Sequence, residues 1–256
     1  DRIYDHMMLD GLEDAYEPRR SMDTFGEDCA AKYGFTRAEQ DAFATASVER
    51  AKAATASGAF AAEITPVTVK SRAGETVVSV DEGPGKVKLD KIASLKPAFK
   101  KDGTITAASS SSINDGAAAL VMMRASTATK LGCKPLARIV GHATHAQEPE
   151  WFATAPLGAT QKALAKAGWA VGDVDLWEIN EAFAVVPMAL MKELNLPHDK
   201  VNVNGGACAL GHPIGASGAR IMVTLIHALK NRGKKKGLAT LCIGGGEATA
   251  LALELV

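Results

Sequence analysis

The sequence NVNGGACALGHPIGASGAR (residues 202–220) joins a short apolar run to a helix with an apolar face. The joining turn is rich in glycine and holds one histidine, His212, followed by Pro213. Glycine has no Cβ atom, so such a turn can bring backbone N–H groups and one imidazole close to a ligand. The proline restricts His212 to extended conformations. The stretch therefore predicts a ligand site at a junction between a strand and a helix of an α/β fold.

Two further segments have the same character. NEAFA (residues 180–184) follows one predicted strand, and CIGGGE (residues 242–247) ends another. With His212 they supply an asparagine, Asn180, and a cysteine, Cys242, each at the end of an apolar run. A thiol and an imidazole on adjacent loops can act as a base or nucleophile pair, which is typical of acyl-thioester chemistry.

Each of these residues also has a purely structural interpretation. A cysteine in a strand is often a small buried hydrophobic residue. Asn180 and Glu181 both suit the N-cap of a helix, and a capping side chain can also hold a water or orient a partner. His212 could be a surface or capping group. The turn lacks the Gly-Lys-Ser/Thr ending of a P-loop and the GxGxxG of a dinucleotide fold.

The bulk composition excludes several classes of function. The chain has 256 residues, with 47% hydrophobic and 23% charged residues, as in an ordinary globular protein. Lys+Arg and Asp+Glu are both 29, so no global field recruits nucleic acid or an anionic membrane. No apolar stretch reaches the length needed to cross a bilayer. We expect neither nucleic acid nor a membrane as a partner.

The four cysteines indicate a reducing, cytoplasmic compartment. They lie far apart and form no CxxC pair, which argues against a zinc site or a disulfide scaffold. We expect no bound metal. Cys29, Cys133 and Cys208 are interpreted as structural, with Cys208 packed beneath the glycine turn.

The first part of the chain is predicted to mix helices with an exposed hairpin. Thr36 and Glu39 form a capping box for a helix that runs to about Ala56. Residues 63–69 and 75–80 alternate like two strands joined by a turn.

The later part of the chain is predicted to alternate strands and helices. From residue 136 onward this alternation favours a mixed sheet covered by helices. It includes a strand at residues 201–203 and an edge or hairpin strand at residues 251–255. Residues 113–123, which are apolar and small, are predicted to form a buried helix or strand.

Taken together, these segments resemble the thiolase family. Residues 204–220 are similar to its histidine signature, NEAF (residues 180–183) to its asparagine motif, and CIGGG (residues 242–246) to its C-terminal cysteine motif. SSINDGAA (residues 111–118) resembles the block that ends the inserted loop domain of the family. The similarity covers essentially the whole chain, and three motifs in the right order make it specific.

The resemblance implies a layered thiolase-like α/β fold, with a mixed five-stranded sheet covered by helices and an added α+β loop domain. We expect a loop domain at residues 1–112, which would bind coenzyme A, and part of the N-terminal thiolase half at residues 113–134. Residues 135–256 would form the C-terminal thiolase domain. By resemblance, the protein would be a homodimer or homotetramer.

The resemblance also implies roles for individual residues. Cys242 would be the acid/base that takes the α-proton of acetyl-CoA in condensation and returns a proton in cleavage. His212 and a water held by Asn180 would bind the thioester oxygen, and the N–H of Gly244 would serve a second oxyanion hole. Coenzyme A or acetyl-CoA enters as substrate, with no covalently bound cofactor. The residues expected along the coenzyme A arm are Met22, Phe99, Ala107, Ser111, Ala182 and Phe183.

The sequence departs from the family pattern at one decisive place. The acyl-accepting cysteine of the family lies in an earlier Cys-x-Ser-Gly motif, which this sequence does not contain. We therefore expect a chain that begins inside a larger protein, is inactive alone and has the N-terminal thiolase segment as its partner. Trp151 and Phe152 add bulk near the expected acyl pocket. Two alternatives are a related acyl-thioester condensing enzyme and a non-catalytic coenzyme A-binding or assembly subunit.

Overall fold

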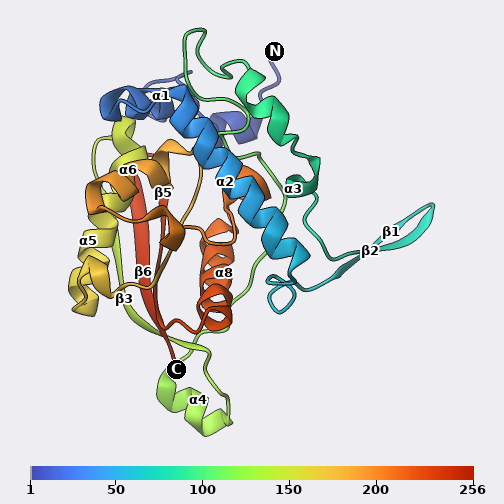
Figure 1. Cartoon of the computed structure of the whole chain (residues 1–256), viewed down its shortest axis with the longest axis vertical. Helices are drawn as coiled ribbons and strands as arrows, with labels where there is room; N and C mark the ends of the chain where they lie inside the picture. The colour runs from blue at the N-terminus through green and yellow to red at the C-terminus, as the bar shows by residue number, and fades with distance from the viewer. Residues whose placement is uncertain (1) are drawn as a thin grey trace.

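A mixed four-stranded sheet forms the centre of the protein. The computed structural model describes residues 2–256. The strand order is β3 (Ala137–Ala146), β6 (Glu247–Leu255), β5 (Lys236–Ile243) and β4 (Leu176–Ile179). β6 pairs antiparallel with both β3 and β5, whereas β4 runs parallel to β5. Figure 1 shows β5 and β6 in the middle of the molecule, flanked by helices.

Helices cover both faces of this sheet, because alternate residues of a strand point to opposite sides. On β4, Trp177 and Ile179 join a core that includes residues of α5 (Ala155–Ala167) and α6 (Val185–Leu194), whereas Leu176 packs with α8 (Ser217–Asn231). Figure 1 shows α5 and α8 on either side of the strands. The predicted α/β architecture with a mixed sheet is confirmed.

Two long helices lie over one end of the sheet. They are α1 (Met22–Tyr33) and α2 (Arg37–Ala56). The predicted capping box at the start of α2 is confirmed: the carboxylate of Glu39 accepts from the backbone N–H of Thr36 at 2.7 Å, and the hydroxyl of Thr36 accepts from the backbone N–H of Glu39 at 3.2 Å. The helix ends at Ala56, as the sequence predicts.

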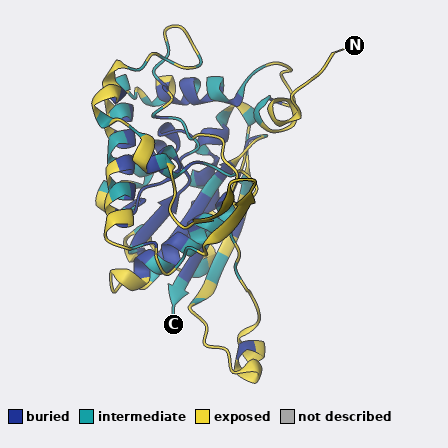
Figure 2. Cartoon of the chain, turned by 90° about the vertical axis from the view of Figure 1, so that its right-hand side faces the viewer, coloured by how far each residue is buried: buried dark blue, intermediate teal, exposed yellow. Residues whose placement is uncertain are grey.

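The predicted hairpin also forms. β1 (Val67–Ser71) pairs antiparallel with β2 (Gly74–Val78), and every residue of both strands is exposed. It projects from the body of the protein in Figure 1, and Figure 2 colours it as exposed along its length. The turn begins β2 at Gly74, whose φ of 118° favours glycine.

The remaining helical segments are short. They are the π-helix η1 (Met8–Leu12), the α-helices α3 (Gly83–Lys86), α4 (Ala125–Leu131) and α7 (Ala207–Leu210), and the 3-10 turns η2 (Leu89–Ser94), η3 (Pro149–Thr154), η4 (Val171–Asp173) and η5 (His198–Lys200).

The prediction for residues 113–123 is wrong. This apolar run forms neither a helix nor an extended strand, and its side chains include Val121 at 88% exposure and Met122 at 67%. It contacts the sheet domain through a bridge between Ile113 and His212 and through Leu120, which packs against the core formed by β4, β5, β6 and α8. Apolar composition stabilises a buried element only where other apolar side chains cover it, and within residues 2–256 most of this run is left uncovered.

Two strand predictions need smaller corrections. The strand at residues 251–255 belongs to a hairpin, but it lies inside the sheet rather than at its edge, because β3 pairs along its outer side. The fifth strand, expected at residues 201–203, is reduced to one parallel bridge between Val201 and Trp177. Asn202 there has a φ of 47°, which ends the extended conformation after one residue.

Candidate active site

A cavity of about 640 Å³ lies at the carboxyl end of β5. Cys242 lines it from the end of β5, Gly244 from the turn between β5 and β6, and His212 from the glycine-rich turn before α8. The structure thus brings all three sequence segments onto one cavity, since Ala182 and Phe183 line it as well. Asn180 is not itself a lining residue and reaches the cavity through the ring of His212.

The backbone of the glycine-rich turn fixes the place of His212. Gly211 has a φ of 89°, and a Cβ atom there would collide with the side chain of Asn114. Only glycine fits this position without strain. The next N–H, that of His212, donates to the carbonyl of Ser112 at 2.9 Å. This bond ties the turn to the segment that the sequence places at the end of the loop domain.

Both ring nitrogens of His212 have a neighbour. Nδ1 lies 2.5 Å from Oγ of Ser217, and Nε2 lies 3.3 Å from Nδ2 of Asn180. The same Ser217 hydroxyl lies 3.1 Å from the carbonyl oxygen of Pro213. A serine hydroxyl has one proton, so it donates either to Nδ1 or to Pro213. The first choice leaves Nε2 protonated and the second leaves Nδ1 protonated.

The imidazole of His212 is held in its neutral form. Burial, followed by the positive charge of Arg220, lowers the pKa of His212 to about 4. Both effects disfavour the imidazolium ion. At neutral pH the ring therefore carries one proton, and its neighbours decide which nitrogen holds it.

Asn180 is completely buried at the end of β4. Its backbone N–H donates to the carbonyl of Thr240 at 3.0 Å, which holds it against β5. Its Nδ2 faces His212, and its Oδ1 has no hydrogen-bond partner among residues 2–256. The N-cap interpretation is wrong, because α6 begins at Val185 and is preceded by Ala184. The side chain of Asn180 is aimed at the imidazole instead.

Glu181 has a structural role that the sequence does not reveal. Its buried carboxylate accepts from the hydroxyl of Ser47 at 2.7 Å, from Nδ2 of Asn202 at 2.8 Å and from the N–H of Cys208 at 3.0 Å. Ser47 belongs to α2, Asn202 to the segment that follows η5, and Cys208 to α7 in the glycine-rich turn. Glu181 therefore joins the helical part of the chain to the turn that carries His212.

Cys242 is a buried thiol, 7% exposed, one residue before the end of β5. Burial raises the pKa of Cys242 to about 12, and the nearby Cys29 contributes in the same direction. The free side chain is therefore a thiol at neutral pH. A thiolate formed there is a strong base, because the buried site favours the neutral form.

The glycine turn after Cys242 needs its residue type. Gly245 and Gly246 have φ values of 83° and 85°. A Cβ on Gly246 would collide with the backbone carbonyl of Gln147. Gly244 lies at the wall of the cavity. A Cβ atom placed on it would be 3.3 Å from Cε of Met22, another lining residue.

Five of the six residues expected along the coenzyme A arm line the same cavity. They are Met22, Phe99, Ser111, Ala182 and Phe183. The rings of Phe99 and Phe183 pack edge to face, with centroids 6.2 Å apart, and the hydroxyl of Ser111 donates to the carbonyl of Ala182 at 3.0 Å. Ala107 is exposed and lies outside the cavity wall.

Several lining residues were not predicted. Leu12, Ile113 and Ile214 add apolar surface. Of the two bulky residues expected near the acyl pocket, Phe152 is buried at the wall with its ring edge to face against Phe25, whereas Trp151 does not line the cavity. Ser217 was missed as well, although it lies inside the histidine signature. Ser217 follows His212 by five residues and begins the predicted helix. A polar side chain at the start of a helix often forms a hydrogen bond with the turn before it, so the sequence carried a signal for this contact.

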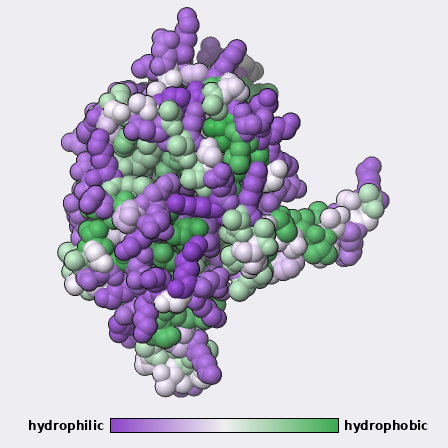
Figure 3. Space-filling view, viewed as in Figure 1, coloured by the Kyte–Doolittle hydropathy of each residue, from purple (hydrophilic) through white to green (hydrophobic). Residues whose placement is uncertain are grey.

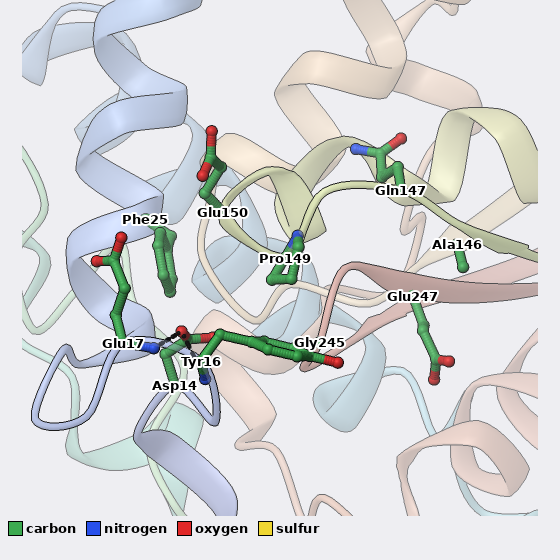
Figure 4. A pocket seen from close by; sticks show the side chains of 10 residues that line it. All are labelled: Asp14, Tyr16, Glu17, Phe25, Ala146, Gln147, Pro149, Glu150, Gly245 and Glu247. Atoms are coloured by element: carbon green, nitrogen blue, oxygen red, sulfur yellow. Dashed lines mark hydrogen bonds between the residues drawn. The ribbon is translucent and has the colours of Figure 1, made fainter.

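A second cavity, of about 590 Å³, lies beside the first but carries no comparable arrangement. Four carboxyl groups line it, from Asp14, Glu17, Glu150 and Glu247. In Figure 4 the side chains of Glu17 and Glu150 point to one side and that of Glu247 to the opposite side, with Tyr16 lying across. The acidic groups do not converge on one point.

The described residues offer no other candidate centre for chemistry. Within residues 2–256, no group of three or more His, Cys, Asp or Glu side chains could hold a metal ion. In the same range, each helix is too short or too polar to cross a bilayer. Of the remaining cysteines, Cys29 is buried in α1, Cys133 is exposed, and Cys208 sits beside Glu181 under the glycine-rich turn.

The fold and this cavity define an α/β protein with a thiol, an imidazole and a carboxamide grouped at the ends of neighbouring strands. Comparison with protein families gives "Thiolase, N-terminal domain" over residues 1–126 and "Thiolase, C-terminal domain" over residues 133–255. The chain belongs to the thiolase family.

Individual relatives agree with this assignment. The chain is 54% identical to an acetyl-CoA acetyltransferase of Chromobacterium violaceum, over 99% of this chain and 65% of the relative. It is 50% identical to an acetyl-CoA acetyltransferase of Paracoccus denitrificans with the same coverage. The crystal structure of the Bacillus anthracis acetyl-CoA acetyltransferase superposes with a TM-score of 0.94 at 46% identity, over 98% of this chain and 64% of that one. The chain therefore spans about 65% of the length of the curated relatives it matches.

Proposed function

We propose that this chain supplies the acid/base and oxyanion-binding part of an acetyl-CoA C-acetyltransferase. The reaction is the reversible Claisen condensation of two acetyl-CoA to acetoacetyl-CoA, or the thiolytic cleavage of short 3-ketoacyl-CoA. The observation that carries the proposal is the shared cavity of Cys242 and His212, with Asn180 at 3.3 Å from the imidazole. The names of the relatives agree with it.

Cys242 moves the proton in this scheme. In the preceding acyl transfer, the thiol of Cys242 gives its proton to the coenzyme A thiolate that leaves. The resulting Cys242 thiolate then takes a proton from the α-carbon of a second acetyl-CoA, and the C–H electron pair becomes the enolate. The raised pKa of Cys242 makes this thiolate a stronger base than an exposed one.

The enolate carbon then forms the new C–C bond. It attacks the acetyl group held by the nucleophilic cysteine of the N-terminal segment, and that cysteine leaves as a thiolate. Negative charge grows on the thioester oxygen before this step. A neutral His212 and Asn180, through a bound water, donate to that oxygen, and the N–H of Gly244 serves the second oxyanion.

Ser217 is the group that can set which ring nitrogen of His212 carries the proton. The oxyanion role requires its hydroxyl to donate to Nδ1, 2.5 Å away, rather than to the carbonyl of Pro213, 3.1 Å away. Donation to Nδ1 leaves the proton on Nε2, beside Nδ2 of Asn180. Two N–H donors then point at one place, which is the arrangement that an oxyanion requires.

Replacing Ser217 by alanine should lower kcat by about 5-fold, because one neutral hydrogen bond that fixes the tautomer is worth ~1 kcal/mol. Rates of acetoacetyl-CoA formation would measure it. Ser94→Ala, which removes an exposed hydroxyl that donates to the carbonyl of Lys91, is the matched control. An unchanged rate in the Ser217 variant would show that the tautomer is set by another group.

A complementation assay tests the proposed function itself. This chain is combined with an N-terminal thiolase fragment that carries the Cys-x-Ser-Gly motif, and acetyl-CoA is the sole substrate. Acetoacetyl-CoA should form only when both pieces are present. A stable complex of the two pieces that makes no product contradicts the catalytic proposal.

The missing motif supports one alternative, a coenzyme A-binding or assembly subunit without catalysis. Such a protein would bind coenzyme A through the apolar cavity wall but give no product in the complementation assay. A related condensing enzyme is a weaker alternative by resemblance, since those relatives usually carry a second histidine where Cys242 stands. Product analysis with acetyl-CoA alone separates it from a thiolase.

Phe152 should limit the acyl group. It is 4% exposed at the wall of the cavity that holds Cys242. Replacing it by alanine should raise kcat/KM for cleavage of a six-carbon 3-ketoacyl-CoA relative to acetoacetyl-CoA by about 10-fold or more, since one or two methylenes are worth ~1–3 kcal/mol in a pocket. The neighbouring Trp151→Ala is the control, because Trp151 does not line the cavity. Equal ratios in both variants would contradict this role.

We propose the same division of the chain as the resemblance implies, with a loop domain at residues 1–112 and a C-terminal domain at residues 135–256. Residues 113–134 would belong to the N-terminal half, which agrees with their exposed apolar side chains.

We also propose a homodimer or homotetramer. The exposed valines of the β1–β2 hairpin support it, and Figure 3 shows apolar surface along that hairpin. A free Cys242 thiol favours the cytoplasm, where thiols stay reduced.

A further inference from the structure

One face of α8 contacts three polar groups from three other parts of the protein. Ser217, Arg220 and Thr224 stand at spacings of three and four residues, which places them on one side of the helix. Ser217 meets the ring of His212, and Nη1 of Arg220 lies 3.7 Å from Oε2 of Glu178. The hydroxyl of Thr224 donates to the carboxylate of Glu63 at 3.0 Å.

Glu178 is an unusual residue for its position. It lies inside β4, whose four residues are all buried, and it is 2% exposed. Burying a carboxyl group is costly unless a cation compensates it. Burial raises the pKa of Glu178, and Arg220 is the cation that opposes this shift. Glu178 and Arg220 therefore form a buried pair between β4 and α8.

This pair joins the two elements that hold His212. Asn180 follows Glu178 by two residues and therefore points to the same face of the strand. Its side chain lies next to Nε2 of the imidazole. One turn before Arg220 on α8 stands Ser217, next to Nδ1. A change in the spacing of β4 and α8 would move Asn180 and Ser217 relative to each other, and with them the ring between them.

Arg220 contributes charge rather than directed hydrogen bonds. Its Nε and Nη1 atoms are buried without a hydrogen-bond partner among the described residues. Besides Glu178, the carboxyl groups of Glu63 and of the exposed Asp81 lie within its electrostatic reach. The same positive charge acts on His212, whose pKa it lowers. No other charged group contributes to that shift within the described residues.

We propose that Arg220 is a positioning residue, which acts through its charge to hold α8 against Glu178 and to keep His212 a neutral Nε2–H donor. The expected effect of Arg220 on catalysis rests on the proposed function. The expected effect of Arg220 on the His212 ring does not. Since the guanidinium makes no directed hydrogen bond, lysine should replace it and neutral side chains should not.

The direct test follows the histidine ring by NMR. The 256-residue chain, of 26.7 kDa, is labelled with ¹⁵N-histidine, and the His212 signals among its six histidines are assigned with a His212→Asn variant. In the parent, His212 should be neutral with its proton on Nε2 and a pKa of about 4. In Arg220→Met the pKa of His212 should rise by about half a pH unit or more, because a like charge is removed.

Three further variants make the NMR result decisive. Arg220→Lys should titrate like the parent, and Arg220→Gln should behave like Arg220→Met. Arg138→Met removes an exposed arginine paired with Glu254 at 2.8 Å and should leave His212 unchanged. An unshifted His212 in both neutral variants overturns the proposal. If neither neutral variant folds, Arg220→Lys decides the question. A His212 that titrates at the ordinary histidine pKa in this variant overturns the proposal, and a titration like that of the parent supports it.

Kinetics of the complemented protein form a separate arm. Arg220→Met should lower kcat by about 10–10²-fold, less than the loss of a whole oxyanion donor, with KM within about two-fold. The acid limb of its pH–rate profile should move to higher pH, whereas that of Arg220→Lys should not. An inactive parent with the expected NMR shifts contradicts the proposed function alone. An active parent with unshifted NMR signals in the neutral variants contradicts the role of Arg220 alone.

Discussion

Replacing Cys242 by alanine is expected to lower acetoacetyl-CoA formation by about 10⁴-fold, the upper end of what a positioned acid/base contributes. Without the sulfur, the imidazole of His212 cannot replace it, because its pKa of about 4 makes it a poor base. Exchange of the acetyl-CoA methyl protons with D₂O isolates this step from C–C bond formation. The exchange should fall with the condensation rate.

Two controls separate the lost sulfur from a disturbed fold. Cys242 lies in a tightly packed core, so Cys242→Ser, which preserves the size of the side chain, should lose exchange as well. Cys133→Ala removes an exposed thiol and should keep full exchange. Proton exchange that survives in Cys242→Ala would remove Cys242 from the role of base.

Replacing His212 by alanine is expected to cost about 10²–10³-fold in kcat, the usual cost of one oxyanion donor. Asn180→Ala should have a similar effect, because its Nδ2 and the imidazole Nε2 are 3.3 Å apart and serve the same oxygen. The double variant should lose less than the product of the two single losses, since the two residues act as a unit. KM should change little in all three.

His142→Ala is the matched control for this second prediction. His142 lies on β3 and is exposed, so its loss should leave kcat unchanged. Losses at His212 and Asn180 that multiply fully in the double variant would show that the two side chains serve different steps. An unchanged kcat in His212→Ala would refute the placement of the oxyanion hole.

Local signals in the sequence were enough to predict much of this fold. The capping box at Thr36 sets the start of α2 because both of its hydrogen bonds lie within four residues. The glycine at position 211 is favoured by a local φ of 89°. Such features depend on neighbouring residues, so their pattern can be recognised without knowledge of the tertiary structure.

Features that depend on distant contacts were missed. The buried run at residues 113–123 was predicted from apolar composition, which cannot say whether other side chains cover it. Ala107 lies outside the cavity wall, and its place on the coenzyme A arm stays a prediction. The place of β6 inside the sheet follows from its pairing with β3, which is far away in sequence.

The candidate site shows the same division. Cys242, His212 and Asn180 could be predicted because each closes an apolar run within a recognisable motif. Glu178 carried a usable signal, since a carboxyl group inside the apolar strand of residues 174–179 implies a buried partner. The partner, Arg220, lies 42 residues later on the other side of the strand and could be identified only from the structure.

A crystal structure of the complemented protein with bound acetyl-CoA tests the account most directly. The account predicts the thioester oxygen within hydrogen-bond distance of Nε2 of His212, and the methyl carbon in contact with the sulfur of Cys242. A thioester bound away from this cavity, or one whose oxygen faces neither His212 nor the water on Asn180, would contradict it.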